Sequence, residues 1–456
     1  MRVPAPRVAI ALVVALLAAG LAIAAVRAGE DGGRRSHVAS RAQVTTSTSP
    51  TTTIAPGTTT SSGPPTTQAI PAALSQTLAQ IKDQVAQVRG LPWLAPLDVQ
   101  VEPDAQFLRQ WDAVTQRDLR PDRVQGDGET FKVLKLIPQG TDYLKTTLDL
   151  LHSAVLGFYD PKTTKLLVRA GGTTLTPEQR ITVAHEMDHA LTDQHFKFGP
   201  ATYALDAADK EEAYTGFTGL LEGDAKLLEA LWAGKYLTPK ERTQAAGGSG
   251  SSSAASVVAK MPPFMVDTLY FPYTTGRAFV ISRYRTGGWA AVNAAYARPP
   301  DSTLVVTHPE LYDAGRTWAT PAFPDLAAAT GCTPVRTGTL GEFNMTELLT
   351  EHLDETTSGD AADGWNGDFF ATIRCGSARG FADRWTAPDT ASAGKLVSAL
   401  SSWAGDWSGG HTKPASDGRF SGSGGAGRLV QAGTRVDLVL ADDTATADKV
   451  GAALGD

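Results

Sequence analysis

Three residues, His185, Glu186 and His189, have the types and the spacing that a catalytic metal site requires. They form the motif H-E-x-x-H within the stretch TPEQRITVAHEMDHALTDQHF. Two imidazoles can each give a nitrogen to one divalent cation, and a carboxylate beside the first can accept a proton from a water on that cation. The motif therefore predicts a Zn2+ site and metal-assisted hydrolysis.

The motif must lie on a helix for this chemistry to work. Thr176 is a good N-cap residue, Pro177 suits the first helical position, and Gln179 completes a capping box with Thr176. These signals predict a helix from Thr176 to about His195. On it, the two motif histidines lie one turn apart on the same face, and the glutamate lies about 100° round from the first of them.

Zinc in catalytic sites takes three protein ligands, so a third must come from another element. Glu222 is the candidate, within a second helix predicted over Ala207–Tyr236. Gly223 follows it, and a glycine inside a helix costs about 1 kcal/mol relative to alanine. We therefore expect close packing there, against the helix that carries the histidines. Without a third ligand, two ordinary hydrogen-bonded histidines would remain the alternative.

H-E-x-x-H followed by a helical E-G-x-A resembles the gluzincins, the zinc peptidases related to thermolysin and aminopeptidase N. The resemblance implies a zincin-like core in which an antiparallel second helix brings the third ligand. It implies that His185, His189 and Glu222 bind Zn2+ and that Glu186 is the general base.

A wider resemblance extends from about Ile70 to the C-terminus. It connects the chain with an uncharacterised group of exported bacterial proteins that are similar to gluzincin metallopeptidases. The stretches that carry it are VLGFYDPKT, LTPEQRITVAHEMDHALTDQHF, LLEGDA, PYTTGRAFV, GGWAAVNAAYARPPDST, THPELY and AADGWNGD.

The resemblance also implies a mechanism and a substrate class. Zinc lowers the pKa of a bound water to about 7, and Glu186 takes its proton and passes it to the leaving amine. Residues 157–172 are predicted to form a β-hairpin. By analogy, its strand Lys165–Ala170 lies at the edge of the cleft and pairs with an extended protein or peptide substrate.

Gluzincins stabilise the oxyanion with a Tyr or His from a later segment. Tyr273 is the first choice here, with Tyr270 and His308 as alternatives, although tyrosines at helix starts and His-Pro pairs in turns more often have a structural role.

Ligating histidines usually donate their second N–H to a carboxylate. The acidic residues Asp188, Asp193 and Asp224 lie near the ligands in the sequence and are the candidates for this role. Asp188, beside His189, could instead lie on a solvated face.

Residues 1–35 contain an apolar run at 8–26 after Arg2 and Arg7, which is typical of a signal peptide or a signal anchor. Its 19 residues favour an uncleaved single-pass membrane anchor over a cleaved signal. Residues 36–69 are rich in Ser, Thr and Pro and predict a disordered stalk. We therefore expect a cell-membrane protein with an extracellular catalytic domain, or a secreted protein if the signal is cleaved.

The two cysteines, Cys332 and Cys375, are predicted to form a disulfide, because an exported protein with an even cysteine count can pair them. The net charge of −7 gives no reason to expect nucleic acid as a partner. Helices interspersed with separate hairpins predict an α+β fold. We expect a metallopeptidase core over residues 70–301 and a smaller α+β part over residues 302–456.

Two other functions remain open at this stage. One is a binding or structural protein of the cell envelope with a non-catalytic zinc site, and the other is a zinc amidase that acts on cell-wall peptides. Glu186 argues against the first, because a site that only binds metal does not need this residue. The sequence does not separate protein substrates from cell-wall peptides.

Overall fold

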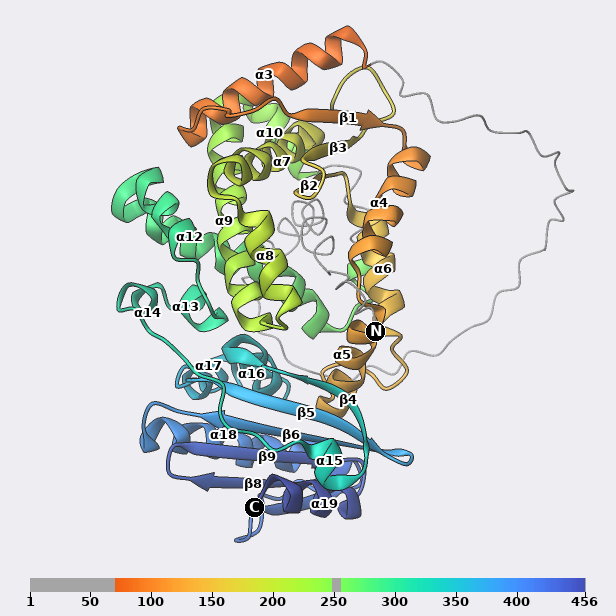
Figure 1. Ribbon diagram of the computed structural model, residues 1–456, viewed down its shortest axis with the longest axis vertical. Coiled ribbons are helices and arrows are strands. Elements are labelled where there is room, and N and C mark those ends of the chain that lie inside the picture. The colour runs from red at the N-terminus through yellow and green to blue at the C-terminus, as the bar shows by residue number, and fades with distance from the viewer. Residues whose placement is uncertain (1–69, 248–255, 456) are drawn as a thin grey trace, which may run out of the picture.

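The computed structural model describes residues 70–247 and 256–455 and has an α+β architecture. A mostly helical N-terminal part packs on a C-terminal part built around a six-stranded sheet (Figure 1). The elements of the N-terminal part are α3 (Ala72–Arg89), β1 (Asp98–Glu102), α4 (Asp104–Asp118), α5 (Pro121–Leu134), α6 (Tyr143–Ala154), β2 (Gly157–Asp160), β3 (Lys165–Arg169), α7 (Pro177–Phe196), α8 (Phe198–Ala207), α9 (Glu211–Tyr236), α10 (Pro239–Ala246), α12 (Pro263–Ala297), α13 (Thr303–Thr307) and α14 (Pro309–Asp313).

The C-terminal part begins after α14. Its elements are α15 (Leu326–Thr330), β4 (Thr333–Gly338), α16 (Gly341–Thr350), α17 (Glu355–Ala362), β5 (Asp368–Cys375), β6 (Ala378–Thr386), α18 (Thr390–Ser408), β7 (Arg419–Gly422), β8 (Gly425–Ala432), β9 (Arg435–Ala441) and α19 (Thr444–Leu454).

The small sheet of the N-terminal part has the strand order β1-β3-β2. The predicted hairpin is confirmed, because β2 and β3 pair antiparallel, with Phe158 opposite Leu167. The predicted position of strand Lys165–Ala170 at the cleft edge is wrong. This strand, β3, is central, because β1 also pairs with it in parallel. The edge strand that packs against α7 is β2.

The helices α9 and α12 cross with their backbones in contact. A Cβ at Gly223 would lie 2.3 Å from the carbonyl oxygen of Gly276, and a Cβ at Gly276 would lie 2.3 Å from that of Gly219. Any side chain at these positions would force the helices apart. The expectation of close packing at Gly223 is therefore confirmed, but the partner is α12 rather than the helix that carries the histidines.

The C-terminal sheet is antiparallel throughout, in the order β4-β5-β6-β9-β8-β7. Successive side chains along a strand point to opposite faces of the sheet, and different helices cover the two faces. On β6, Phe381 points into a large core shared with α5 and α18, while Ala382 packs in a separate cluster with α19. The predicted disulfide is confirmed, because Cys332 and Cys375 are bonded. Disulfides persist in oxidising environments.

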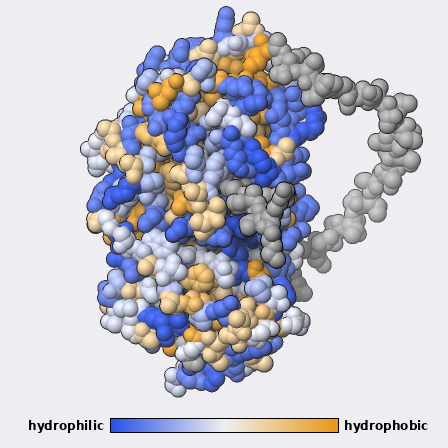
Figure 2. Space-filling model, viewed as in Figure 1, coloured by the Kyte–Doolittle hydropathy of each residue, from blue (hydrophilic) through white to orange (hydrophobic). Residues whose placement is uncertain are grey.

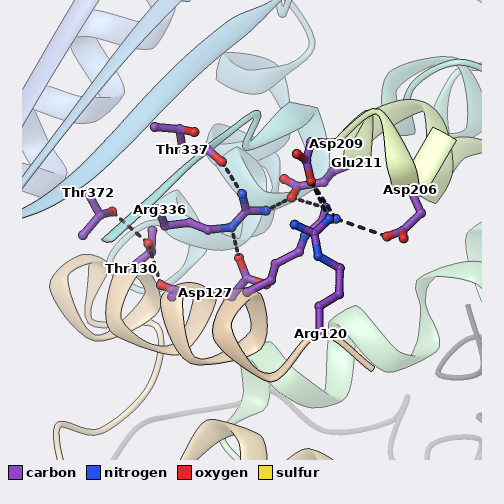
Figure 3. A network of polar contacts seen from close by, with 11 residues as sticks. Arg120, Asp127, Thr130, Asp206, Asp209, Glu211, Arg336, Thr337 and Thr372 are labelled. Carbon is purple, nitrogen blue, oxygen red and sulfur yellow. Dashed lines mark hydrogen bonds and ion pairs between the residues drawn. The ribbon is translucent and has the colours of Figure 1, made fainter. Parts of the chain in front are cut away.

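A network of ion pairs joins the two parts (Figure 3). Arg336 of β4 donates from Nε to Asp127 of α5 at 2.6 Å and also pairs with Glu211 at the start of α9. Arg123 of α5 pairs with Glu211 as well, and with Asp206 of α8 at 3.1 Å. The network therefore fastens the first strand of the large sheet to the helix that continues to Glu222.

The predicted location as a single-pass membrane protein is wrong, because no helix within residues 70–247 and 256–455 is long and apolar enough to cross a bilayer. A spanning helix needs about 20 mainly apolar residues. Helix α12 has the length but contains Asp267, Arg277 and Arg283. The predicted anchor and stalk, residues 1–35 and 36–69, lie outside the described residues.

The surface seen in Figure 2 is mixed. Small hydrophobic patches alternate with hydrophilic residues over this face. Among the described residues, the large hydrophobic side chains that are exposed are Leu94 and Leu231. This face therefore shows only scattered apolar area.

Candidate metal centre

Local signals fix the helix that carries the motif. The Thr176 N–H donates to the side chain of Gln179 at 2.9 Å, and the Gln179 N–H donates to the Thr176 hydroxyl at 3.2 Å. This is the predicted capping box, and α7 runs from Pro177 to Phe196 as expected. His185 and His189 therefore stack one turn apart on the same face, and both are buried.

The structure brings the three predicted ligands together. The Nε2 atoms of His185 and His189 lie 3.2 Å apart, and Oε2 of Glu222 lies 3.4 Å from the first and 3.5 Å from the second. Two ligands at about 2.0–2.1 Å from a tetrahedral zinc ion lie about 3.3–3.4 Å apart. The three donor atoms thus form a nearly equilateral triangle of the size that one such ion needs.

The charge state of the ligands also fits a divalent cation. Oε2 of Glu222 is buried and has no hydrogen-bond partner among the described residues, which is costly for a carboxylate. Burial raises the pKa of Glu222 to about 7, and the nearby His185 opposes the shift. Burial also lowers the pKa of His189 to about 4, so its imidazole is neutral at pH 7 and can offer a lone pair.

A carboxylate that the sequence analysis missed orients the first ligand. Nδ1 of His185 lies 3.2 Å from Oε2 of Glu229, and Lys226 donates to the other oxygen of Glu229 at 2.7 Å. A hydrogen bond from Nδ1 leaves the Nε2 lone pair facing the other ligands. Glu229 follows Glu222 by seven residues, two helical turns, and this spacing could have identified it.

Replacing Glu229 should weaken metal binding without abolishing it. In Glu229→Ala, His185 loses the partner that fixes its tautomer and ring orientation, so we expect zinc affinity to fall by about 10- to 100-fold. Competition with a chromophoric chelator measures this change. Glu229→Gln keeps a hydrogen-bond acceptor and should lose less affinity. Equal affinities for all three proteins would contradict the assigned role.

Glu186 is buried beside the triangle without belonging to it. Its Oε2 accepts the backbone N–H of Tyr159 in β2 at 2.9 Å, while Oε1 has no hydrogen-bond partner among the described residues. Burial raises the pKa of Glu186 well above its usual value, and the charge of Glu222 raises it further. The hydrogen bond from the Tyr159 N–H opposes this shift. The carboxylate is therefore anchored through one oxygen, and the other is available to exchange a proton.

The three candidate oxyanion donors are placed differently. Tyr273 of α12 is buried, and its pKa is raised by burial and then by the charges of Glu222 and Glu186, which places it near the triangle. Tyr270 is buried one turn earlier on the same helix. His308 lies between α13 and α14, in a separate cluster with the acidic residues Glu342 and Asp363. Only the tyrosines therefore lie on the helix that contacts α9 beside Glu222.

Among the described residues, none of the three acids predicted to orient the ligands hydrogen-bonds to a ligand histidine. Asp224 binds Arg89 through both oxygens, at 3.1 and 2.9 Å, and accepts the hydroxyl of Tyr296 at 2.7 Å. Asp188 lies 3.8 Å from the same arginine. Asp193 accepts the Tyr159 hydroxyl at 2.9 Å. The first two therefore belong to a buried ion cluster that joins α3 to α7 and α9.

The comparison with known proteins finds a match only outside the metal centre. Residues 332–451 match the model of a family described as a domain of unknown function (DUF8575). This segment lies in the C-terminal part and includes none of the residues of the metal centre. No curated protein and no solved structure matches the chain. The resemblance to gluzincins therefore stays a prediction.

Proposed function

We propose that this chain is a zinc-dependent peptidase of the gluzincin type with a zincin-like core, and that it hydrolyses peptide bonds in a protein or peptide substrate. The observation that carries the proposal is the triangle formed by His185, His189 and Glu222. Its side lengths and its N2O donor set suit Zn2+, and three protein ligands leave a coordination position for water or substrate.

The residues around the triangle would each have a different role in hydrolysis. Bound Zn2+ would supply a Lewis acid that polarises a carbonyl oxygen and lowers the pKa of a bound water to about 7. Glu186, held by the Tyr159 N–H, would accept the proton of the attacking water through its unpaired Oε1 and then donate it to the leaving amine. Glu229 would keep His185 in the ligating tautomer.

The edge strand β2 supports a peptide as the substrate. In its pairing with β3, the Arg169 N–H donates to the carbonyl of Leu156, so alternate residues from Leu156 onward direct their backbone groups toward β3. Gly157 and Tyr159 then direct theirs toward the side of β2 that has no strand partner, where the Tyr159 N–H meets Glu186. An extended peptide that adds to this edge would lie beside the general base.

Tyr273 is the proposed oxyanion donor. Its pKa is raised well above the usual tyrosine value by burial and by the surrounding carboxylates, so its hydroxyl keeps its proton at neutral pH. A protonated hydroxyl can donate a hydrogen bond to a developing oxyanion. The same helix is held against α9 by the contact between Gly223 and Gly276, which fixes the depth of Tyr273.

The position of Glu186 favours a hydrolase over a protein that only binds zinc. A further buried carboxyl group beside the three metal ligands is costly, and its unpaired Oε1 gains nothing for structure. A catalytic role explains why the group is anchored and yet left with one free oxygen. Whether the peptide belongs to a protein or to a cell wall depends on contacts outside this arrangement.

The proposal is tested by removing and restoring the metal. The full chain is expected to contain zinc, to cleave peptides of a broad fluorogenic library, to lose this activity after treatment with a strong chelator, and to recover it with Zn2+. Circular dichroism of the stripped protein controls for unfolding. A zinc-loaded, folded protein that cleaves no peptide of the library overturns the peptidase assignment, and a protein without zinc overturns the metal centre.

A further inference from the structure

A second group of possible metal ligands lies where the two parts of the molecule meet. His308 lies between α13 and α14, Glu342 is in the first turn of α16, and Asp363 directly follows α17. One nitrogen of the histidine and one oxygen of each acid lie within 4.8 Å of one another. Figure 1 shows α13 beside α16 at the junction of the two parts, and these two helices are in contact.

The geometry around His308 resembles that around His185 only in part. Nε2 of His308 lies 3.0 Å from Oδ1 of Asp363, at ion-pair distance, and this buried nitrogen has no hydrogen-bond partner among the described residues. In the neutral tautomer with the proton on Nδ1, Nε2 offers a lone pair, so it and the carboxylate oxygen can both turn toward one ion. On the other side of the ring, Nδ1 lies 3.6 Å from the exposed Glu310, whereas Nδ1 of His185 lies 3.2 Å from the buried Glu229.

Glu342 supplies the buried charge that a cation would neutralise. It is 3% exposed, and burial raises its pKa, while His308 and the hydroxyls of Thr346 and Thr307 oppose the shift. These hydroxyls donate to its two oxygens at 3.1 and 3.2 Å. Each carboxylate oxygen has a further lone pair, so Glu342 can still bind a metal. A carboxyl group at this depth is stable when it is protonated or when a nearby cation balances the charge of its ionised form.

We propose that His308, Glu342 and Asp363 form a second metal site, which takes a divalent transition-metal ion and ties the α13–α14 connection to α16 and α17. Imidazole suits Zn2+ and its first-row neighbours, whereas Ca2+ and Mg2+ prefer oxygen ligands alone. Asp363 is half-exposed at a helix end, so it can move toward an ion and leaves room for water ligands. The site uses none of the elements that carry the candidate metal centre, and its role is structural.

Metal counting in variants tests the site separately from catalysis. The double variant His185→Ala/His189→Ala removes the first centre and should keep one zinc ion per chain after dialysis against micromolar free Zn2+, whereas the wild type should hold two. Adding His308→Ala to the double variant should reduce the count to none. Adding Asp363→Asn, at an exposed position, should weaken binding at least tenfold. Loading with Co2+ should give a visible absorption band in the double variant that His308→Ala abolishes.

His411→Ala in the same background is the matched control. His411 also lies beside an aspartate, with Nδ1 3.0 Å from Asp406, but it is exposed and belongs to no cluster of three ligands among the described residues. This variant should keep its ion. The proposal is overturned if the His185→Ala/His189→Ala protein is folded and binds no zinc, or if its ion survives His308→Ala. Neither result changes the test of peptide hydrolysis, because that test depends on the first centre.

Discussion

Glu186→Gln should lower the rate of peptide hydrolysis by about a thousandfold while the protein keeps its zinc. General acid–base catalysis contributes roughly 10²- to 10⁴-fold, and the amide cannot take up the proton of the attacking water. The substitution is isosteric, and the amide oxygen can still accept the Tyr159 N–H. It also replaces a buried carboxyl group that bears a strongly raised pKa, so folding should not suffer. Turnover of the fluorogenic library and zinc content by mass spectrometry measure the two effects.

Glu178→Gln provides a matched control for this variant. Glu178 lies on the same helix, in its first turn, and it is also buried. The same chemical change at this position should leave the hydrolysis rate within about twofold of the wild type. Activity of Glu186→Gln within tenfold of the wild type would remove Glu186 from the mechanism. If Glu186→Gln instead loses its zinc, Glu186 is a metal ligand. We do not expect this result, because Glu186 is not one of the three residues of the triangle.

Arg89→Met should lower the free energy of unfolding by about 3–5 kcal/mol, because it leaves buried carboxylates without their cation. Arg89 is fully buried at the end of α3, binds Asp224 through two hydrogen bonds and lies 3.8 Å from Asp188. Its guanidinium also stacks 4.3 Å from the ring of Trp289. Because Asp224 and Asp188 belong to α9 and α7, zinc affinity should fall as well. Denaturant unfolding and the chelator titration measure the two effects.

Two further variants separate the loss of charge from the loss of packing. Arg89→Met combined with Asp188→Asn and Asp224→Asn should recover most of the lost stability, since no uncompensated carboxylate remains. Arg169→Met removes a bidentate pair with the exposed Asp104 and should cost at most about 1 kcal/mol. If Arg89→Met costs no more than Arg169→Met, the buried cluster does not hold the two metal-binding helices together.

The elements that the sequence predicts best are those with strong local signals. Helix α7 begins at its predicted capping box. Local signals of the same kind are present in α3, whose buried Leu74, Leu78, Ile81 and Val85 lie on one face, and in α12, which is interrupted at Gly287 and Gly288. Strand β1 was missed, because five residues carry little periodicity and its partner strand lies far along the chain. Helix α5 was missed as well, because Gly126 and Gly128 weaken its helical pattern.

Within the site, too, the arrangement along one helix was predictable from the sequence. Spacing along one helix predicted how His185 and His189 would meet, and a second helix brought Glu222 to them. Contacts between elements were not predictable in this way. The hairpin motif could not reveal that β1 would cover one side of β3, and proximity in sequence made Asp188 a candidate for a role that Glu229 fills from α9. Asp188 instead faces α3, an element that contains none of the motif.

The core shared between α5 and the large sheet affects how this chain can evolve. Val133 and Leu134 pack with Phe381 of β6, more than two hundred residues later in the sequence, and the buried Thr130 hydroxyl meets that of Thr372 at 2.8 Å. The segment that matches the family model therefore covers this face of its sheet with its own α18, but shares the same core with α5, which lies outside it. Volume changes at Phe381 should accordingly be accompanied by compensating changes in α5.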